Sequence, residues 1–166
     1  MNNMLTKHII SGFLFGLSVS LISWTVGLIL NSILAKRRYY QKLSHLNFIT
    51  SSKLNRRIGL RYFKWVVKNT PFKYFNTQLK LGPKNKDLRQ IRYQMTLAET
   101  SHLIGFILVM LVAVYYSITK GLVFGSFVML ANILMNLYPS LLQQQNKRRI
   151  DQLIRKLNNV NRDTVR

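Results

Sequence analysis

The sequence predicts an all-α membrane protein with three transmembrane helices and an amphipathic, basic and aromatic helical segment at the membrane interface. Two observations lead to this fold class. First, the 166 residues include 25 Lys and Arg but only four Asp and Glu, a formal net charge of +21, while 48% of the residues are hydrophobic. A basic disordered tail would be far less hydrophobic, and an ordinary soluble domain would mix positive and negative charges more evenly. Second, the charges are segregated, so that three long stretches carry none.

Each uncharged stretch is long enough to cross a hydrocarbon core of about 30 Å, which takes roughly 20 helical residues. A helix of a soluble core would show a polar face, and these stretches show almost none. Within a single membrane domain of residues 1–166, we expect three transmembrane helices: residues 9–35, 100–119 and 121–142. A cleaved signal peptide is the alternative for the first helix. Its apolar part is longer than the roughly 7–15 residues of a signal core, and no clear cleavage site precedes Lys36, which favours a retained helix.

The positions of the basic residues predict the orientation of the chain. Residues 36–98 contain sixteen Lys or Arg and one acid, and residues 143–166 contain seven bases and two acids. By the positive-inside rule, we expect the first segment to be a basic cytoplasmic or interfacial loop and the second to be a cytoplasmic tail. The protein should then span the cell (inner) membrane several times, with its N-terminus outside and its C-terminus in the cytoplasm.

Aromatic and basic residues alternate within this loop, between Arg61 and Leu81. Such side chains suit the headgroup layer of a membrane, where rings insert and cations meet anionic lipids. Pro71 should divide the stretch into two short helical pieces, and Gly82-Pro83 should end it. Basic residues among aromatics also bind single-stranded nucleic acid, but the flanking spans hold this segment at a bilayer. We therefore expect membrane lipids, and no nucleic acid, as its partner. The aromatic residues are Tyr62, Phe63, Trp65, Phe72, Tyr74 and Phe75.

The only glutamate of the chain, Glu99, lies three residues before His102 at the expected start of the second span. This spacing places both side chains on one helix face. A carboxylate beside an imidazole orients the ring and favours its protonated form, so His102 is a candidate general base and Glu99 its orienting partner. The alternative is structural, because Thr96 and Glu99 also fit a capping box at a helix start, where Glu99 would favour the positive end of the helix dipole.

A polar stripe follows the third expected span, with members three or four residues apart. Polar groups in hydrocarbon usually face other helices or a water-filled cavity. Pro139 lies within the stripe and should kink the helix and free a backbone carbonyl. For Asn132 and Ser140 we favour hydrogen bonding between helices as the simpler interpretation. The stripe consists of Asn132, Asn136, Ser140, Gln143 and Lys147.

The predicted topology brings the start of the second span and the end of the third to the cytoplasmic face. Glu99 and His102 should then lie at a similar depth to Gln143, Asn146 and Arg149. We expect no metal site, because one Glu and one well-placed His leave too few ligands, and the chain has no Cys. The sequence also lacks a glycine-rich phosphate loop and a GxSxG elbow. A pocket that opens to the inner leaflet is therefore the candidate site.

Two short motifs carry a resemblance to a known family. The first is an A-E-x-x-H element, Ala98 to His102, and the second is NLYPSLLQQQNKRR, Asn136 to Arg149. The first resembles the A-E-x-x-H element of the glycosyl-4,4'-diaponeurosporenoate acyltransferases. The second resembles the N-x-x-P-like element and the Q-x-x-N-R-x-R element of the same family. Lys147 stands where an arginine is usual in that family. Phe63-Lys64-Trp65, followed by Pro71, is a loose counterpart of a Lys/Trp-rich stretch, and the first span matches only in hydrophobicity.

Members of that family are small bacterial membrane enzymes that esterify a sugar hydroxyl of a carotenoid glycoside with a fatty acyl chain. The resemblance implies no bound cofactor. It implies an acyl donor carried by coenzyme A or by acyl carrier protein, and a glycosylated carotenoid or other glycolipid as acceptor. It implies His102 and Glu99 as catalytic residues, and the following as residues that bind donor or acceptor: Asn136, Gln143, Asn146, Arg149 and Trp65.

A non-enzymatic membrane scaffold, or an accessory subunit that binds anionic lipid, is the alternative function. It accounts for the spans, the basic loop and a capping box without any chemistry. It does not account for polar groups of two spans converging on one face. Lipid bound beside His102 would favour the enzyme, whereas a polar stripe packed entirely against the other spans would favour the scaffold.

Overall fold

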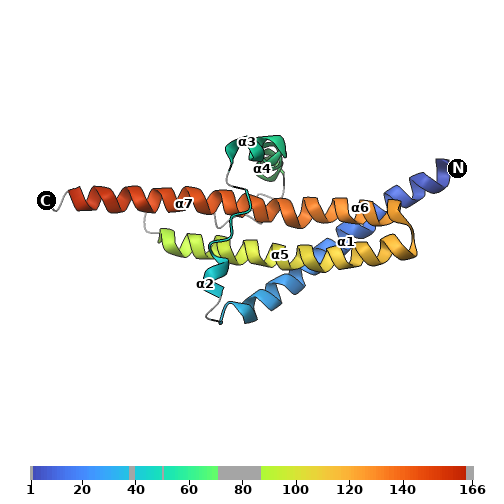
Figure 1. The fold of residues 1–166 in the computed structure, drawn as a ribbon, viewed down its shortest axis with the longest axis horizontal. Coiled ribbons are helices and arrows are strands. Elements are labelled where there is room, and N and C mark those ends of the chain that lie inside the picture. Colours follow the sequence, from blue (N-terminus) through green and yellow to red (C-terminus); the bar gives the residue numbers. More distant parts are fainter. Residues whose placement is uncertain (1, 38–39, 50, 71–86, 164–166) are drawn as a thin grey trace. The chain divides into compact units, whose positions relative to one another are not determined.

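The computed structural model describes residues 2–37, 40–49, 51–70 and 87–163, and no strand occurs among them (Figure 1). Three helical segments are long and apolar enough to cross a membrane. They are α1 (Asn2–Leu34), α5 (Leu88–Thr119), and the continuous run of α6 (Leu122–Asn132), the π-helical segment η3 (Ile133–Leu137) and α7 (Tyr138–Asp163). The predicted all-α membrane fold with three spans is confirmed.

The chain divides into two compact units, which we describe separately. The first unit comprises residues 1–40 and 98–140, and the second comprises residues 41–97 and 141–166. Helices α5 and α7 each contribute residues to both units. The short helices α2 (Tyr40–Leu43), α3 (Ser52–Arg57) and α4 (Leu60–Asn69) precede α5 in the chain.

The first unit is a bundle in which α1 packs against α6 and η3. Small residues allow this close approach, because a Cβ atom added at Gly16 would lie 2.8 Å from the Val128 Cα atom. The apolar centre of the unit contains Val109, Ala113, Phe124 and Val128. Large apolar side chains also cover the outside of the helices, as the surface of a lipid-embedded bundle requires; Leu14, Ile29, Leu111 and Ile118 are all at least half exposed.

A π-helical turn stands directly before Pro139, where the sequence predicts a kink. Proline has no backbone N–H, so it cannot donate to a carbonyl of the preceding turn. Here the preceding turn widens, and the Tyr138 N–H donates to the Ile133 carbonyl five residues earlier. The wider turn contains the buried residue Asn136.

The second unit contains the amphipathic part of the basic loop. Helix α4 buries Leu60, which is 1% exposed, and leaves Tyr62 and Trp65 largely exposed. This is the first of the two helical pieces that the sequence predicts. The second piece, with Phe72, Tyr74 and Phe75, and the breaks expected at Pro71 and Gly82-Pro83, lie outside the described residues.

Helix α5 begins at Leu88, well before the expected start of the second span. Asp87 caps it, since its Oδ1 atom accepts a hydrogen bond of 2.9 Å from the Arg89 N–H. Thr96 is therefore inside the helix, where its hydroxyl donates to the Arg92 carbonyl one turn earlier. The capping-box interpretation of Thr96 and Glu99 is wrong, because the helix continues through this region and leaves no free N–H groups there to cap.

Candidate active site

The first unit contains a cluster of buried polar side chains contributed by α1, α5, and the α6–α7 run. Each is at most 5% exposed. Such groups are costly within a membrane unless they find partners or serve a function. We call this set the polar cluster: Ser20, Ser23, Asn31, Glu99, Thr100, Ser101, Asn132, Asn136 and Ser140.

Hydrogen bonds within the polar cluster connect all three spans of the first unit. The Asn31 amide of α1 donates to the Ser101 hydroxyl of α5 at 3.0 Å. The Asn132 amide donates to the Phe106 carbonyl of α5 at 2.9 Å, which is the helix-to-helix role that the sequence predicts for this residue. The Asn136 amide donates to the Asn132 side chain at 2.9 Å and to the Ser23 hydroxyl of α1 at 3.4 Å. Asparagines of the third span are thus hydrogen-bonded to both of the other two spans.

His102 lies at the edge of the polar cluster, with an aromatic ring on one side and an amide on the other. The Trp24 ring of α1 is parallel to the imidazole, with 6.4 Å between ring centroids and 5° between planes. The Asn136 side chain lies beside the imidazole. Two polar atoms at this point, His102 Nδ1 and Asn136 Oδ1, are buried and have no hydrogen-bond partner among the described residues. Buried polar atoms without a partner are uncommon, so this point of the first unit is the best candidate for a functional role.

Glu99 lies one turn before His102 on α5 and is completely buried. It interacts with the surrounding protein. Burial of this kind removes the Glu99 carboxyl group from water. No group of three or more metal-ligating His, Cys, Asp or Glu side chains occurs within the part of the chain that the structure describes.

The other predicted site residues belong to the second unit. Gln143 and Asn146 are partly buried on α7, and the Oε1 atom of Gln143 is buried with no hydrogen-bond partner among the described residues. Arg149 is exposed on the same helix, and Trp65 is 66% exposed on α4. The structure thus brings Glu99, His102 and Asn136 together in one unit. That all seven residues serve one substrate stays a prediction.

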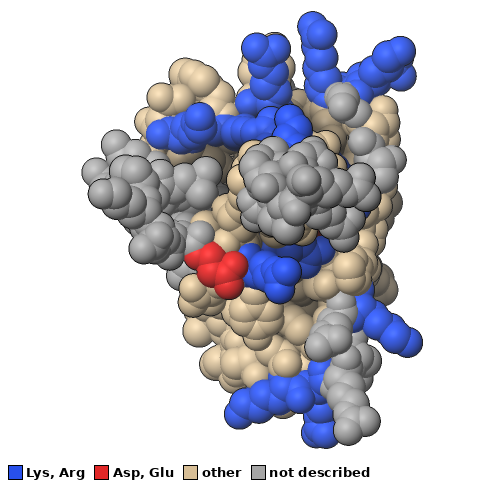
Figure 2. All heavy atoms as spheres, turned by 90° about the vertical axis from the view of Figure 1, so that its left-hand side faces the viewer, with Lys and Arg blue, Asp and Glu red and all other residues tan. Residues whose placement is uncertain are grey.

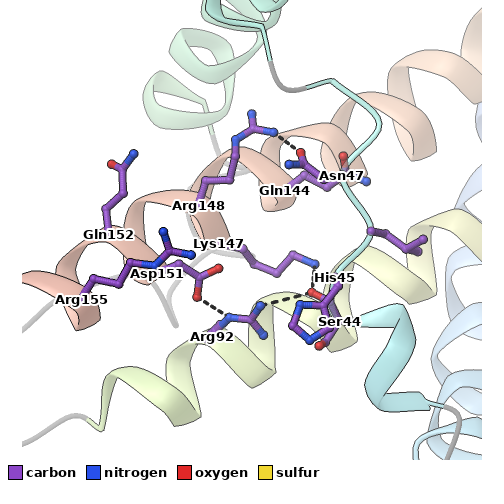
Figure 3. A pocket seen from close by; sticks show the side chains of 11 residues that line it. Ser44, His45, Asn47, Arg92, Gln144, Lys147, Arg148, Asp151, Gln152 and Arg155 are labelled. Atoms are coloured by element: carbon purple, nitrogen blue, oxygen red, sulfur yellow. Dashed lines mark hydrogen bonds and ion pairs between the residues drawn. The ribbon is translucent and has the colours of Figure 1, made fainter. Parts of the chain in front are cut away.

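The second unit has a basic pocket of about 310 Å³ between α5, α7 and the segment after α2 (Figure 3). Three of its four Lys and Arg side chains have partners within the protein, and the fourth, Arg155, is exposed. Lys147, which is 3% exposed, donates to the Ser44 carbonyl at 3.0 Å, and Arg92 forms an ion pair of 2.5 Å with Asp151. Arg148 donates to the Asn47 side chain and to a nearby backbone carbonyl. These contacts fasten the segment after α2 to α7, so the pocket is above all a structural junction.

Comparison with models of protein families matches residues 36–156 to CrtO, glycosyl-4,4'-diaponeurosporenoate acyltransferase. The chain belongs to this family. No curated protein and no solved structure matches it. The glycosyl-4,4'-diaponeurosporenoate acyltransferase family is one of acyltransferases of the carotenoid glycoside pathway, and the match includes both short motifs that carry the resemblance in the sequence.

All seven predicted site residues fall within the region that matches the glycosyl-4,4'-diaponeurosporenoate acyltransferase family, whereas α1 precedes it. The contribution of α1 to the site was missed by reasoning from sequence. A signal for it is present, because Ser20, Ser23, Gly27 and Asn31 recur at spacings of three or four, as the polar stripe of the third span does. Trp24 lies on the same face as these residues and adds the ring that stacks on His102.

Proposed function

We propose that the protein transfers a fatty acyl chain from acyl-coenzyme A or acyl carrier protein to a sugar hydroxyl of a carotenoid glycoside or a related glycolipid. One observation carries the proposal. His102, whose Nδ1 atom is buried, lies one helical turn after the buried Glu99 and beside Asn136, within the region that matches an acyltransferase family. In this proposal His102 is the catalytic base, and Glu99 is a positioning residue that acts through it.

The proposed reaction is a single transfer of the acyl group from the thioester sulfur of the donor to a hydroxyl oxygen of the sugar. The sugar hydroxyl oxygen attacks the thioester carbonyl carbon of the donor while His102 takes the hydroxyl proton. A carbon–oxygen bond forms, the carbon–sulfur bond breaks, and the proton returns from the imidazolium to the departing thiolate. The Glu99 carboxylate would stabilise the transient imidazolium, and the Asn136 amide would help to orient the hydroxyl.

The remaining predicted residues are proposed to bind the donor and the acceptor. Gln143 and Asn146 supply amide groups, Arg149 supplies a cation, and Trp65 supplies an exposed ring on an amphipathic helix. Both proposed donors are anionic. On the face of the molecule shown in Figure 2, Lys and Arg side chains are widely spread, and one small acidic patch lies among them. Such a surface attracts anionic partners over long distances at low salt. The bias of the basic segments supports an inner-membrane protein with a cytoplasmic C-terminus.

Acyl transfer in a defined membrane tests this proposal. The purified protein in nanodiscs would be supplied with a glycosyl-4,4'-diaponeurosporenoate and either acyl-coenzyme A or acyl carrier protein, and the ester would be detected by mass spectrometry. We expect an ester from one donor and its loss in Glu99→Gln. Asp87→Asn, which changes the carboxylate at the start of the same helix, is the matched control and should stay active.

Two results would contradict the proposal. If neither donor yields an ester, and pigment extracts of cells with and without the gene are identical, the scaffold alternative accounts better for the protein. If Glu99→Gln and His102→Ala both fold and retain full activity, acyl transfer takes place without the residues assigned here.

A further inference from the structure

A second pocket, of about 360 Å³, lies entirely within the second unit, between α3, α4 and α7. Its polar lining consists of four cations and two amides: Arg56, Arg61, Lys64, Arg149, Asn55 and Gln145. We call it the α3–α4 pocket. Among the described residues, no acidic side chain lines it. Its volume falls in the range of small-ligand sites, which begins at about 300 Å³.

Local structure positions the backbone that carries these cations. Helix α3 is capped by the Ser51 hydroxyl, which accepts a hydrogen bond from the Leu54 N–H. Gly59 then turns the chain with φ of 74°, a left-handed conformation that favours glycine, and α4 begins at the next residue. Leu60 is 1% exposed and anchors α4, and Arg61 and Lys64 of its first turns line the same pocket as Gln145 and Arg149 of α7.

In the part of the chain that the structure describes, no acidic side chain pairs with the cations of the α3–α4 pocket. Within the described residues, none of their side chains makes a hydrogen bond or an ion pair. They do act on one another, because burial and the positive charges of Arg149 and Lys68 lower the pKa of Lys64. The basic pocket of Figure 3 differs in this respect, since there Arg92, Lys147 and Arg148 all have partners within the protein.

A cluster of like charges that repel one another, beside the nearly buried amide of Asn55 (7% exposed), has the composition of an anion site. Arginine binds phosphate oxygens through two parallel N–H groups, and lysine adds a compact charge. Carboxylates are bound in the same way, but the several phosphate charges of coenzyme A match four cations better than a single carboxylate does, and the phosphodiester of an anionic phospholipid supplies one charge of the same kind.

We propose that the α3–α4 pocket binds a phosphate group, held by Arg149 and Lys64 with Arg56 and Arg61 at its sides. Two ligands would carry that group to this place. One is the coenzyme A or phosphopantetheine part of an acyl donor, which rests on the proposed function. The other is the headgroup of an anionic phospholipid, which requires no catalysis.

Equilibrium binding to the full-length protein tests the pocket and distinguishes the two ligands. In nanodiscs of phosphatidylcholine, calorimetry would measure the affinity for coenzyme A and for pantetheine, which lacks its phosphates. In a second arm, native mass spectrometry would measure retention of phosphatidylglycerol. The variants are Arg149→Gln and Lys64→Gln. Arg155→Gln is the control, because it removes one exposed cation of α7 that does not line this pocket.

If the phosphate belongs to the donor, coenzyme A binds and pantetheine does not, and each variant weakens coenzyme A binding by about tenfold, as loss of one charge-assisted hydrogen bond would. If it belongs to a lipid, the same variants lose retained phosphatidylglycerol instead. In either case Arg155→Gln should change binding less than about twofold. The proposal is overturned if neither probe binds, or if the control loses as much as the variants, since diffuse charge would then explain the binding. Both arms measure binding alone, so their outcome is separate from that of the acyl-transfer assay.

Discussion

Gly27 of α1 offers a test of how closely the first two spans must pack. A Cβ atom added there would lie 2.4 Å from the backbone oxygen of Ser101 on α5, and Cβ contacts below 3.0 Å essentially never occur. In Gly27→Ala the two helices must therefore separate locally by about 0.6 Å. The obstacle is backbone, so no flexible side chain can move aside to relieve it.

That separation has a second effect one turn away. The hydrogen bond from the Asn31 amide to the Ser101 hydroxyl measures 3.0 Å, and about 0.6 Å more would take it beyond hydrogen-bonding distance. Overpacking costs about 1–3 kcal/mol, and a hydrogen bond between membrane helices contributes about 0.6 kcal/mol. We expect Gly27→Ala to lower the free energy of unfolding by about 2–4 kcal/mol.

Unfolding by sodium dodecyl sulfate in mixed micelles, followed by circular dichroism, would measure this loss. Leu28→Ala is the control, because Leu28 is 45% exposed on the outside of the bundle. A double-mutant cycle with Asn31→Leu tests the mechanism, since Asn31→Leu should cost little once Gly27→Ala has broken the hydrogen bond. A Gly27→Ala protein as stable as wild type, with an unchanged cost for Asn31→Leu, would refute the reasoning.

Three further predictions concern the second unit. Asp87→Ala removes the cap of α5 and should lower the free energy of unfolding by about 1 kcal/mol, whereas Asp87→Ser should retain most of it. Arg92→Gln breaks the partly exposed ion pair with Asp151 and should cost less than about 1 kcal/mol in the same assay. Arg149→Gln should raise the pKa of Lys64 toward 10.5, as followed by NMR of methylated lysines, because one repelling charge is removed. Because the pKa of Lys64 is lower in the folded than in the unfolded chain, the folded chain binds fewer protons at pH values between these two pKa values. The free energy of unfolding therefore rises with pH in that range, and this rise should be smaller in Arg149→Gln. A steeper rise, or an unchanged pKa, would contradict the assignment.

The spans could be predicted from sequence because hydrocarbon imposes a simple rule. Any stretch of about 20 uncharged residues must satisfy its backbone internally, and a helix does so without help from the rest of the chain. The start of α5 could not be predicted in the same way. Its first turns are polar, and they are helical because Ile91 and Met95 pack on Ile150 of α7, a contact between residues far apart in the sequence.

The candidate site was only partly predictable for a related reason. Glu99 and His102 stand out because acids are scarce and the two lie one helical turn apart. The asparagines of the third span stand out because polar residues are rare in membrane helices. Trp24 does not stand out, because its place beside His102 depends on how α1 crosses α5, which is decided by backbone contacts at residues such as Gly27.

The rate of acyl transfer by His102→Ala tests the central claim most directly. His8→Ala is the matched control, because His8 also lies on a span of the first unit, with its ring edge against Phe124. With both proteins folded in nanodiscs, we expect kcat/KM for ester formation to fall about 100- to 10,000-fold in His102→Ala, the usual contribution of a general base, and to change little in His8→Ala. Equal activity in the two variants would show that His102 is not the base and would contradict the mechanism proposed here.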